Sequence, residues 1–350
     1  MISSDSQLAE ILPRLRQFPR VAVDTEADSL HCYFEKLCLI QLTFDGEDIL
    51  VDPLSGKIDL QPLCTALSER QIVLQGMDFD LRLLRRAFDL PVQEVFDTVI
   101  ASRMIGLREF SLAALVQQYF DVTLAKGSQK ANWARRPLPP TMETYAKNDT
   151  HFLLPLAAKM EEQMSDLGRL EWFRQSCQRA LEQTLVSRER DPEEAWRITG
   201  SGTLPPREGA VLRAIWRWRD GEARQADRPS FHILQNSAML DSAKAFAAGD
   251  IPEFPHLSDR RRRGFLAAAQ EALELPESAW PQRPPRGTRT RTPGFDKKVE
   301  ELRRRRDQHA KELALDPAFI APRSALEGIA ADPSRCQTLL VQWQRDLLGL

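Results

Sequence analysis

The sequence predicts an α/β domain, with a mixed sheet flanked by helices, followed by an all-α part. Three short runs rich in Val, Leu and Ile lie close together within residues 20–55, as in an antiparallel meander. Helical and strand patterns then alternate over residues 60–105, which is typical of an α/β sheet domain. No convincing strand pattern follows residue 157, so the rest of the chain is expected to be helical.

The individual elements follow from short local patterns. The predicted strands are VAVDTEA, LCLIQLTF, DILVDP, QIVLQG and the start of EVFDTVIASRMIG. Predicted helices include QPLCTALSE, DFDLRLLRRAF and SLAALVQQYF, the last of which has Ser111 as its N-cap. A long helix is expected from LPPTMETYAKNDT to LAAKMEEQM, with Thr141 as its N-cap and a kink at Pro155.

A chain of 350 residues is too long for one ordinary domain. The stretch around Gly200, Gly202, Pro205 and Pro206 has the composition of a connection, and PESAWPQRPPRGTRTRTPGF that of a linker. The expected division is an α/β domain at 1–190, a connection at 191–206, a helical domain at 207–280, a Pro/Arg-rich linker at 281–296 and a C-terminal helical region at 297–350.

Composition excludes some classes of protein. The 48 basic and 50 acidic residues nearly balance, so overall charge indicates neither a nucleic acid nor a membrane partner. Five cysteines without C-x-x-C spacing argue against a zinc site or a disulfide framework. The N-terminus has no apolar segment of a secretion signal, and no run of 18 apolar residues exists. We therefore expect a cytoplasmic protein without membrane attachment.

Acidic residues stand at the ends of three predicted elements. Asp24 and Glu26 end a strand at i and i+2, so both point to one face. Asp80 lies in the first turn of a helix, and Tyr145 and Asp149 share a helix face at i and i+4. Taken singly, each is also compatible with a solvated strand end, a helix-dipole partner or a rim tyrosine. Together, four carboxylates in one cleft would need divalent cations such as Mg²⁺ or Mn²⁺.

The order D-x-E, then D, then Y-x-x-x-D resembles the tyrosine-bearing branch of the DEDD exonuclease superfamily, which has the ribonuclease-H-like fold. FDTVIASRMIG, SLAALVQQYFDVTLAKGSQKANWARRPL and YAKNDTHFLLPL resemble ribonuclease D, over about residues 18–180. From residue 207, VLRAIWRWRDGEARQADRPSFHILQNSAML is similar to the helicase-and-ribonuclease-D C-terminal (HRDC) domain. Ribonuclease D has these domains in this order, and the C-terminal region resembles its further helical region more weakly.

The resemblance implies a 3′→5′ exoribonuclease that acts on structured RNA, notably in tRNA 3′ maturation, and releases 5′-phosphomononucleotides. It implies two Mg²⁺ or Mn²⁺ ions and no obligate protein partner. The implied metal ligands are Asp24, Glu26, Asp80 (through water) and Asp149. Tyr145 would hold the attacking water.

The resemblance also implies residues that meet the substrate. Leu30 would wedge against the terminal bases, and the expected contacts nearby are Lys126, Gln129, Trp133 and Arg136. A solvated basic loop and a bracing Trp133 are the alternatives. The family often has His and then Asn or Ala five and four residues before the third acid, where this chain has Gln75 and Gly76.

Two other functions remain open from the sequence. A DNA-directed 3′→5′ exonuclease would use the same acids, and a non-catalytic RNA-binding scaffold would keep the fold without the reaction. The basic runs DRRRRG and ELRRRRDQ could contact phosphates or form solvated helix faces.

Overall fold

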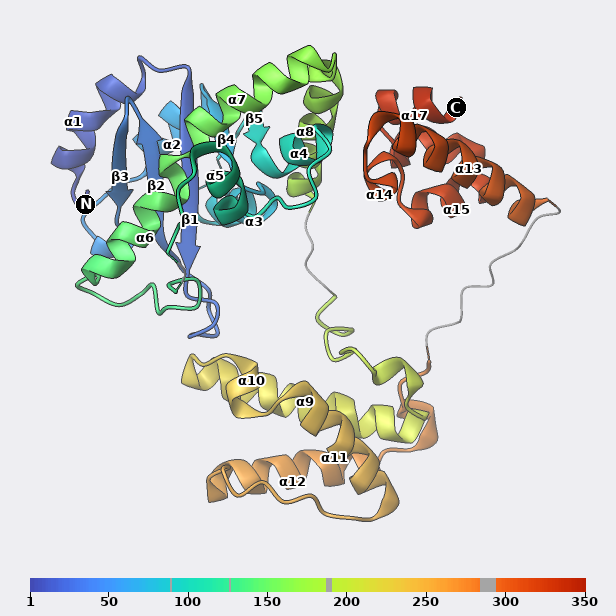
Figure 1. Ribbon diagram of the computed structural model, residues 1–350. Coiled ribbons are helices and arrows are strands. Elements are labelled where there is room, and N and C mark those ends of the chain that lie inside the picture. Colours follow the sequence, from blue (N-terminus) through green and yellow to red (C-terminus); the bar gives the residue numbers. More distant parts are fainter. Residues whose placement is uncertain (89, 126, 187–190, 284–293) are drawn as a thin grey trace. The chain divides into compact units, whose positions relative to one another are not determined.

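The computed structural model describes the chain except for residues 89, 126, 187–190 and 284–293 (Figure 1). It divides into two compact units. The sheet unit comprises Met1–Ala27, Leu37–Ser187 and Arg289–Leu350. The helical unit comprises Asp28–Lys36 and Arg188–Thr288.

The sheet unit contains a five-stranded mixed sheet with the order β3-β2-β1-β4-β5. β1 pairs antiparallel with β2, and β2 with β3, whereas β4 and β5 continue the sheet in parallel from β1. The meander and the α/β alternation predicted from the sequence are thus confirmed. The strands are β1 (Arg20–Ala27), β2 (Leu37–Phe44), β3 (Glu47–Val51), β4 (Gln71–Leu74) and β5 (Glu94–Asp97).

Helices cover the sheet. All residues of β2 are buried, which explains why its sequence is an almost continuous apolar run. α6 packs across β1, β2 and β3 (Figure 1). The helices of this part are α1 (Asp5–Leu15), α2 (Gln61–Ser68), α3 (Asp78–Phe88), α4 (Thr98–Met104), α5 (Leu112–Phe120), α6 (Pro140–His151), α7 (Leu153–Asp166) and α8 (Leu170–Leu185).

The predicted long helix is two helices. α6 ends at His151 and α7 begins at Leu153. Pro155 accounts for the break, because its ring clashes with the carbonyl of His151 four residues earlier and it has no N–H for the helical bond. The expected N-cap was wrong by two residues, since Pro139 is the N-cap and Thr141 lies inside the first turn. The break matters because α6 alone carries Tyr145 and Asp149.

The helical unit has a core of its own. Its helices are α9 (Pro206–Ala226), α10 (Ser230–Ile233), α11 (Asn236–Ala248) and α12 (Asp259–Leu273). Val211, Leu212 and Ile215 of α9 pack with Phe246 of α11 and Phe265 of α12. Gly264 permits a close helix contact, because a Cβ there would lie 2.8 Å from the Trp218 indole nitrogen. The expected helical domain is therefore a packed body.

The C-terminal helices belong to the sheet unit. They are α13 (Phe295–Leu313), α14 (Pro317–Ile320), α15 (Arg323–Ala331), α16 (Cys336–Leu339) and α17 (Gln342–Leu348). Trp343 is 1% exposed, and its ring stacks on Trp172 of α8 with centroids 5.1 Å apart. Its indole N–H donates to Ser176 Oγ at 3.0 Å. The C-terminal region thus shares a hydrophobic core with the sheet.

Trp343→Ala is expected to destabilise the sheet unit by about 3–5 kcal/mol, since it leaves a large cavity beside Trp172. Trp343→Phe keeps an aromatic ring but removes the bond to Ser176, so its cost should be smaller. Thermal unfolding followed by circular dichroism measures both. Equal melting temperatures for the Ala variant and the wild type would show that α17 adds nothing to this core.

No helix in the described part of the chain is both long and apolar enough to cross a lipid bilayer.

Candidate active site

Three carboxylates converge on one point of the sheet unit. Asp24 and Glu26 lie on the same face of β1, as the period of a strand requires. Asp149 comes from α6, which packs over β1. Each of the three offers an oxygen, and these oxygens lie within 4.8 Å of one another. A strand and a helix far apart in the sequence therefore bring the predicted acids together.

Asp80 is fixed against β1 between these acids. Its side chain is 5% exposed and lies in the first turn of α3. Its Oδ1 accepts the backbone N–H of Thr25 at 3.1 Å and the Thr25 hydroxyl at 2.5 Å. Asp80 is not one of the three carboxylates with oxygens within 4.8 Å, but its charge acts on all of them.

The docking of α6 positions Tyr145 and Asp149. Met142, Ala146 and Thr150 form its buried face, and the Thr150 hydroxyl lies 2.7 Å from that of Thr43 on β2. The adjacent face, at i and i+4, presents Tyr145 and Asp149. The sequence spacing thus places the phenol and the third carboxylate on one side of the helix.

Burial and mutual repulsion raise the pKa of every acid in the group. The pKa of Asp24 lies well above its usual range, because the side chain is buried and Asp80, Asp149 and Glu26 surround it. Burial, with the neighbouring acids, raises the pKa of Glu26 to about 9 and that of Asp149 to about 7. Burial raises that of Asp80 to about 6, against the bonds from Thr25. Without a counterion, Glu26 therefore holds a proton at neutral pH, and Asp149 holds one in about half of the molecules.

The donor set suits a hard divalent cation. Carboxylate oxygens are the ligands that Mg²⁺ and Mn²⁺ prefer, and the described residues place no histidine or cysteine in the group. Gln41, on β2 opposite Asp24, donates to its Oδ2 at 3.3 Å. The other amide atom, Gln41 Oε1, is buried without a hydrogen-bond partner within the described ranges. A hydrated cation would supply the missing donor.

Tyr145 lies beside the acids. Burial and the charges of Asp149 and Glu26 raise the pKa of its phenol, and Gln129 hydrogen-bonds to it. Its ring packs near that of Trp133, with centroids 6.1 Å apart. The phenol therefore stays protonated at neutral pH and is held from two sides.

Trp133 and Arg136 make supporting contacts within the protein. Trp133 is 1% exposed, and a ring in the core has no free face for a base. The Arg136 guanidinium donates to both carboxylate oxygens of Asp52, at 2.6 and 2.7 Å, and to the Cys38 carbonyl at 2.7 Å. These bonds tie the loop before α6 to β2 and to the residue that follows β3. The predicted contacts of Trp133 and Arg136 with RNA stay predictions.

The remaining predicted RNA contacts are Gln129, Leu30 and Lys126. Gln129 is exposed and adjoins Tyr145, and Leu30 has 43% of its surface exposed. Lys126 lies outside the described residues. The roles of Gln129 and Leu30 toward RNA remain predictions.

Sequence reasoning missed two supporting residues, Thr25 and Gln41, and noted Gln75 only as a departure from the family pattern. Thr25 was visible between the two acids of the D-x-E motif, but nothing local showed that it anchors Asp80. Gln75 donates to the Phe110 carbonyl at 2.8 Å and accepts from Thr98. Gly76 has a φ of 85°, a conformation that favours glycine in the turn from β4 into α3. Gln75 and Gly76, which depart from the family pattern, thus fit this chain through the hydrogen bonds of Gln75 and the backbone conformation of Gly76.

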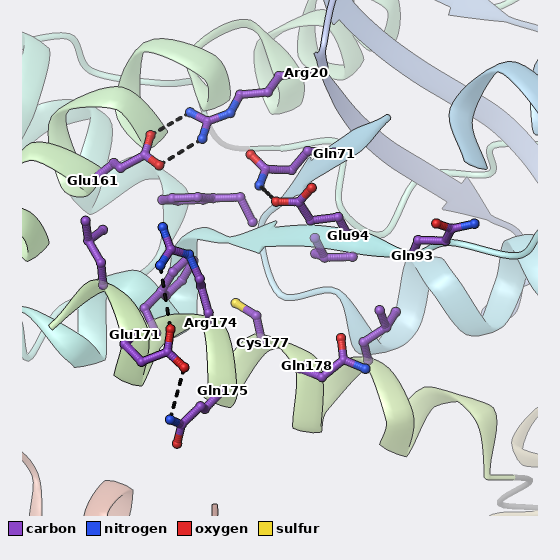
Figure 2. A pocket seen from close by; sticks show the side chains of 15 residues that line it. Arg20, Gln71, Gln93, Glu94, Glu161, Glu171, Arg174, Gln175, Cys177 and Gln178 are labelled. Carbon is purple, nitrogen blue, oxygen red and sulfur yellow. Dashed lines mark hydrogen bonds and ion pairs between the residues drawn. The ribbon is translucent and has the colours of Figure 1, made fainter. Parts of the chain in front are cut away.

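A separate pocket of about 510 Å³ lies at the opposite end of the strands (Figure 2). Arg20 begins β1, Gln71 begins β4 and Glu94 begins β5, whereas the acids lie toward the other end of β1. Arg20 makes a bidentate ion pair with Glu161, at 2.7 and 2.9 Å, and Gln71 bonds to Glu94. Two of the lining pairs are thus bonded to each other, although Gln71 Oε1 has no hydrogen-bond partner within the described ranges. The pocket lies away from the acids, so it is not the candidate site.

Comparison with known proteins gives the class of the chain. Residues 1–165 match the family model described as 3'-5' exonuclease, and residues 208–247 match that of the HRDC domain. The chain is 33% identical over 295 residues to ribonuclease D of Escherichia coli K12, covering 81% of this chain and 77% of that protein. It is 30% identical to ribonuclease D of Musicola paradisiaca, covering 100% and 96%.

A solved structure agrees. The crystal structure of E. coli RNase D, described as an exoribonuclease involved in structured RNA processing, matches with a TM-score of 0.72 and 26% identity. The match covers 100% of this chain and 96% of that one. The fold and the acidic site define a 3′→5′ exonuclease with an HRDC domain. The chain belongs to the ribonuclease D family, and it is an exoribonuclease.

Proposed function

We propose that the chain shortens RNA from its 3′ end with two divalent cations, Mg²⁺ or Mn²⁺, held by Asp24, Glu26, Asp80 and Asp149. The observation that carries the proposal is the convergence of three carboxylates within 4.8 Å, with the charge of Asp80 acting on each. Without bound cations, such a cluster of carboxylates destabilises the folded protein, and cations offset that repulsion. Asp80 is expected to act through water, since it lies outside the three-carboxylate group.

The chain's own residues complete the chemistry. When bound, the cations activate a water molecule and stabilise the leaving oxygen of the phosphodiester. The phenol of Tyr145, which stays protonated because its pKa is raised, would orient that water by a hydrogen bond. Gln129 restrains the phenol, and Trp133 braces its ring. Tyr145 thus has a positioning role in proton transfer and is not the base.

We further propose precursors of tRNA as substrates, with trimming at their 3′ ends. Membership of the ribonuclease D family supports RNA as the substrate, and the E. coli relative's link to structured RNA processing supports the finer assignment. Leu30 and Gln129 are the proposed contacts to the terminal nucleotides.

The test is a digestion time course on a 5′-labelled tRNA precursor with a 3′ extension, beside a DNA strand of the same 3′ sequence. We expect stepwise shortening of the RNA from its 3′ end, with release of nucleoside 5′-monophosphates. A strong preference for the DNA would favour the DNA-directed alternative. No shortening of either strand, with no cation binding by calorimetry, would favour the scaffold.

Divalent cations should stabilise the protein more at high pH. The folded-state pKa values of Glu26 and Asp149, about 9 and 7, lie above the ordinary values near 4. The metal-free site therefore loses stability as pH rises from about 4 through 9, because over that range folding must take up protons, and the carboxylates repel one another once those protons are lost. A cation at about 100 times its Kd should add about 2.7 kcal/mol, or about 5–10 °C.

The measurement is the difference in melting temperature between Mg²⁺ and EDTA at pH 5.5 and pH 8.5. The difference should be large at pH 8.5 and small at pH 5.5, where protons compete for the same oxygens. Asp241→Asn, an exposed change on α11, should behave as the wild type. An equal shift at both pH values would contradict cation binding by these carboxylates.

A further inference from the structure

Gln41 carries a buried amide in the middle of an apolar strand. Every residue of β2 is buried, and Gln41 is 0% exposed. The one hydroxyl of the strand, that of Thr43, bonds to Asp48 and Thr150. A buried amide that lacks a hydrogen bond costs about 1–3 kcal/mol, and an apolar side chain of the same shape avoids that cost. Packing alone therefore does not explain an amide at this position.

The register of the sheet puts Gln41 beside the acids. Gln41 pairs with Asp24 of β1 in the antiparallel ladder, so their side chains lie on the same face of the sheet. Gln41 Nε2 donates to Asp24 Oδ2 at 3.3 Å. α6 packs over this face, where Thr150 bonds to Thr43, two residues further along β2. Gln41 therefore lies on the face that α6 covers and contacts a candidate cation ligand.

The oxygen of this amide has no partner. Gln41 Oε1 is buried, and no hydrogen-bond donor reaches it within the described ranges. Turning the amide around would place its oxygen against the ionised Asp24 carboxylate and remove the N–H group from it. The hydroxyl of Thr25, next along β1, already bonds to Asp80, and that of Thr43 is also used. The donor for Gln41 Oε1 must therefore come from outside these residues.

A hydrated cation supplies such a donor. Ionised carboxylates only accept hydrogen bonds, so the acids cannot donate to Gln41 Oε1 once they hold a cation. Mg²⁺ usually keeps several of its water molecules when it binds to a protein, and these water molecules donate hydrogen bonds. A nucleotide does not reach the amide, because Gln41 has no exposed surface. The position therefore suits a molecule as small as water that arrives with the cation.

We propose that Gln41 is a positioning residue of the cation site. Its amide N–H restrains Asp24, and its amide oxygen accepts a hydrogen bond from a water molecule of the hydrated cation. Residues that orient the ligands of a metal site typically contribute about 10–100-fold to its affinity. The inference rests on the proposed function and deepens it, because it assigns a buried residue of the sheet to cation affinity.

Gln41→Met tests the inference, because methionine has about the length of glutamine and no amide. Gln71→Met is the matched control. Gln71 of β4 also donates to a carboxylate, that of Glu94, and its buried Oε1 has no partner in the described part of the chain, but it lies at the opposite end of the strands from the acids. Binding of Mn²⁺ is measured by calorimetry at pH 8.5 without RNA. Gln41→Met should bind Mn²⁺ about tenfold more weakly than the wild type, and Gln71→Met within about twofold of it.

Gln41→Glu separates the two halves of the amide. Glutamate keeps an oxygen that accepts a hydrogen bond from water but has no N–H group for Asp24. Gln41→Glu should bind Mn²⁺ at least as tightly as the wild type, because the acceptor is kept and a negative charge is added. Binding as weak as that of Gln41→Met would overturn the role of the amide oxygen.

Melting temperatures in EDTA separate an effect on the cation from an effect on the fold. Gln41→Met should melt close to the wild type, since it removes a buried amide whose oxygen is unpaired. If it melts far lower, the Mn²⁺ affinity of Gln41→Glu decides the matter. Equal Mn²⁺ affinities of Gln41→Met and the wild type would overturn the inference and leave the proposed function intact. A wild-type protein that binds no Mn²⁺ would overturn the proposed function instead.

Discussion

Asp24→Asn is expected to lower the single-turnover rate of RNA shortening by at least about 10³-fold, corresponding to about 4 kcal/mol of lost cation-dependent stabilisation. Asp24 is buried in the site, and Asp80, Asp149 and Glu26 all act with that burial to raise its pKa. Asparagine keeps the shape of the side chain and removes the charge. The rate is measured on 5′-labelled RNA with enzyme in excess.

The same substitution should not unfold the protein. Removing one of the four carboxylates reduces the electrostatic repulsion in the metal-free site. In EDTA at pH 8.5 the variant should therefore melt no lower than the wild type. Asp241→Asn, the same change on an exposed position of α11, controls for charge and should retain full activity. An Asp24→Asn rate within tenfold of the wild type would remove Asp24 from the proposed ligand set.

Tyr145→Phe is expected to slow the reaction by about 10²-fold, the lower end of the range for a group that assists proton transfer. Phenylalanine keeps the ring that packs near Trp133 and removes only the hydroxyl that would orient the water. Cation binding should be unchanged, because the phenol is not among the proposed ligands.

The control for the tyrosine is Tyr119→Phe. The Tyr119 hydroxyl donates to Gln163 of α7 at 2.7 Å. The Tyr119→Phe substitution therefore removes a comparable hydrogen bond away from the acids. It should leave the rate unchanged. A Tyr145→Phe enzyme as fast as the Tyr119→Phe enzyme would assign water positioning to another group.

The acids could be predicted from the sequence because the chemistry demands fixed residue types at fixed local spacings. Asp24 and Glu26 share a strand face, and Tyr145 and Asp149 share a helix face, whatever the rest of the fold does. The strands of the sheet could also be predicted from local sequence, since each is a short apolar run. The break before α7 also has a local cause in Pro155.

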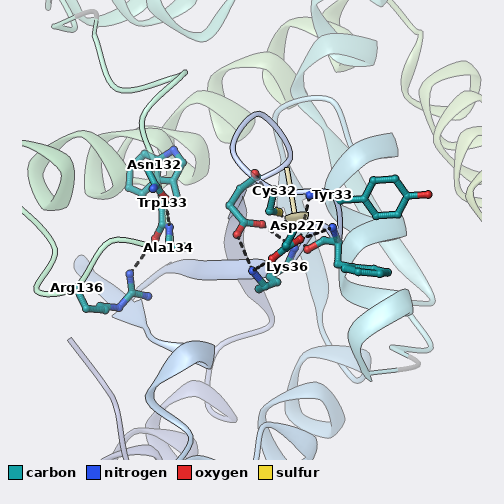
Figure 3. A network of polar contacts seen from close by, with 10 residues as sticks. Cys32, Tyr33, Lys36, Asn132, Trp133, Ala134, Arg136 and Asp227 are labelled. Carbon is teal, nitrogen blue, oxygen red and sulfur yellow. Dashed lines mark hydrogen bonds and ion pairs between the residues drawn. The ribbon is translucent and has the colours of Figure 1, made fainter. Parts of the chain in front are cut away.

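Residues defined by distant partners could not be predicted in this way. Arg136 is directed by Asp52, 84 positions earlier, and a basic loop in sequence does not reveal whether its charge meets a phosphate or a buried carboxylate. The docking of Trp343 on Trp172 and the grouping of Asp28–Lys36 with α9 (Figure 3) have the same character. Such contacts depend on the tertiary packing and leave no short pattern.

The most direct test of the central claim is the dependence of RNA shortening on divalent cations. The wild-type protein, stripped with EDTA, is mixed with 5′-labelled tRNA precursor, and Mg²⁺ or Mn²⁺ is then added in excess of the chelator. We predict no shortening in EDTA and a ladder that begins at the 3′ end once the cation is added. Undiminished shortening in EDTA would contradict a reaction that depends on cations gathered by Asp24, Glu26, Asp80 and Asp149.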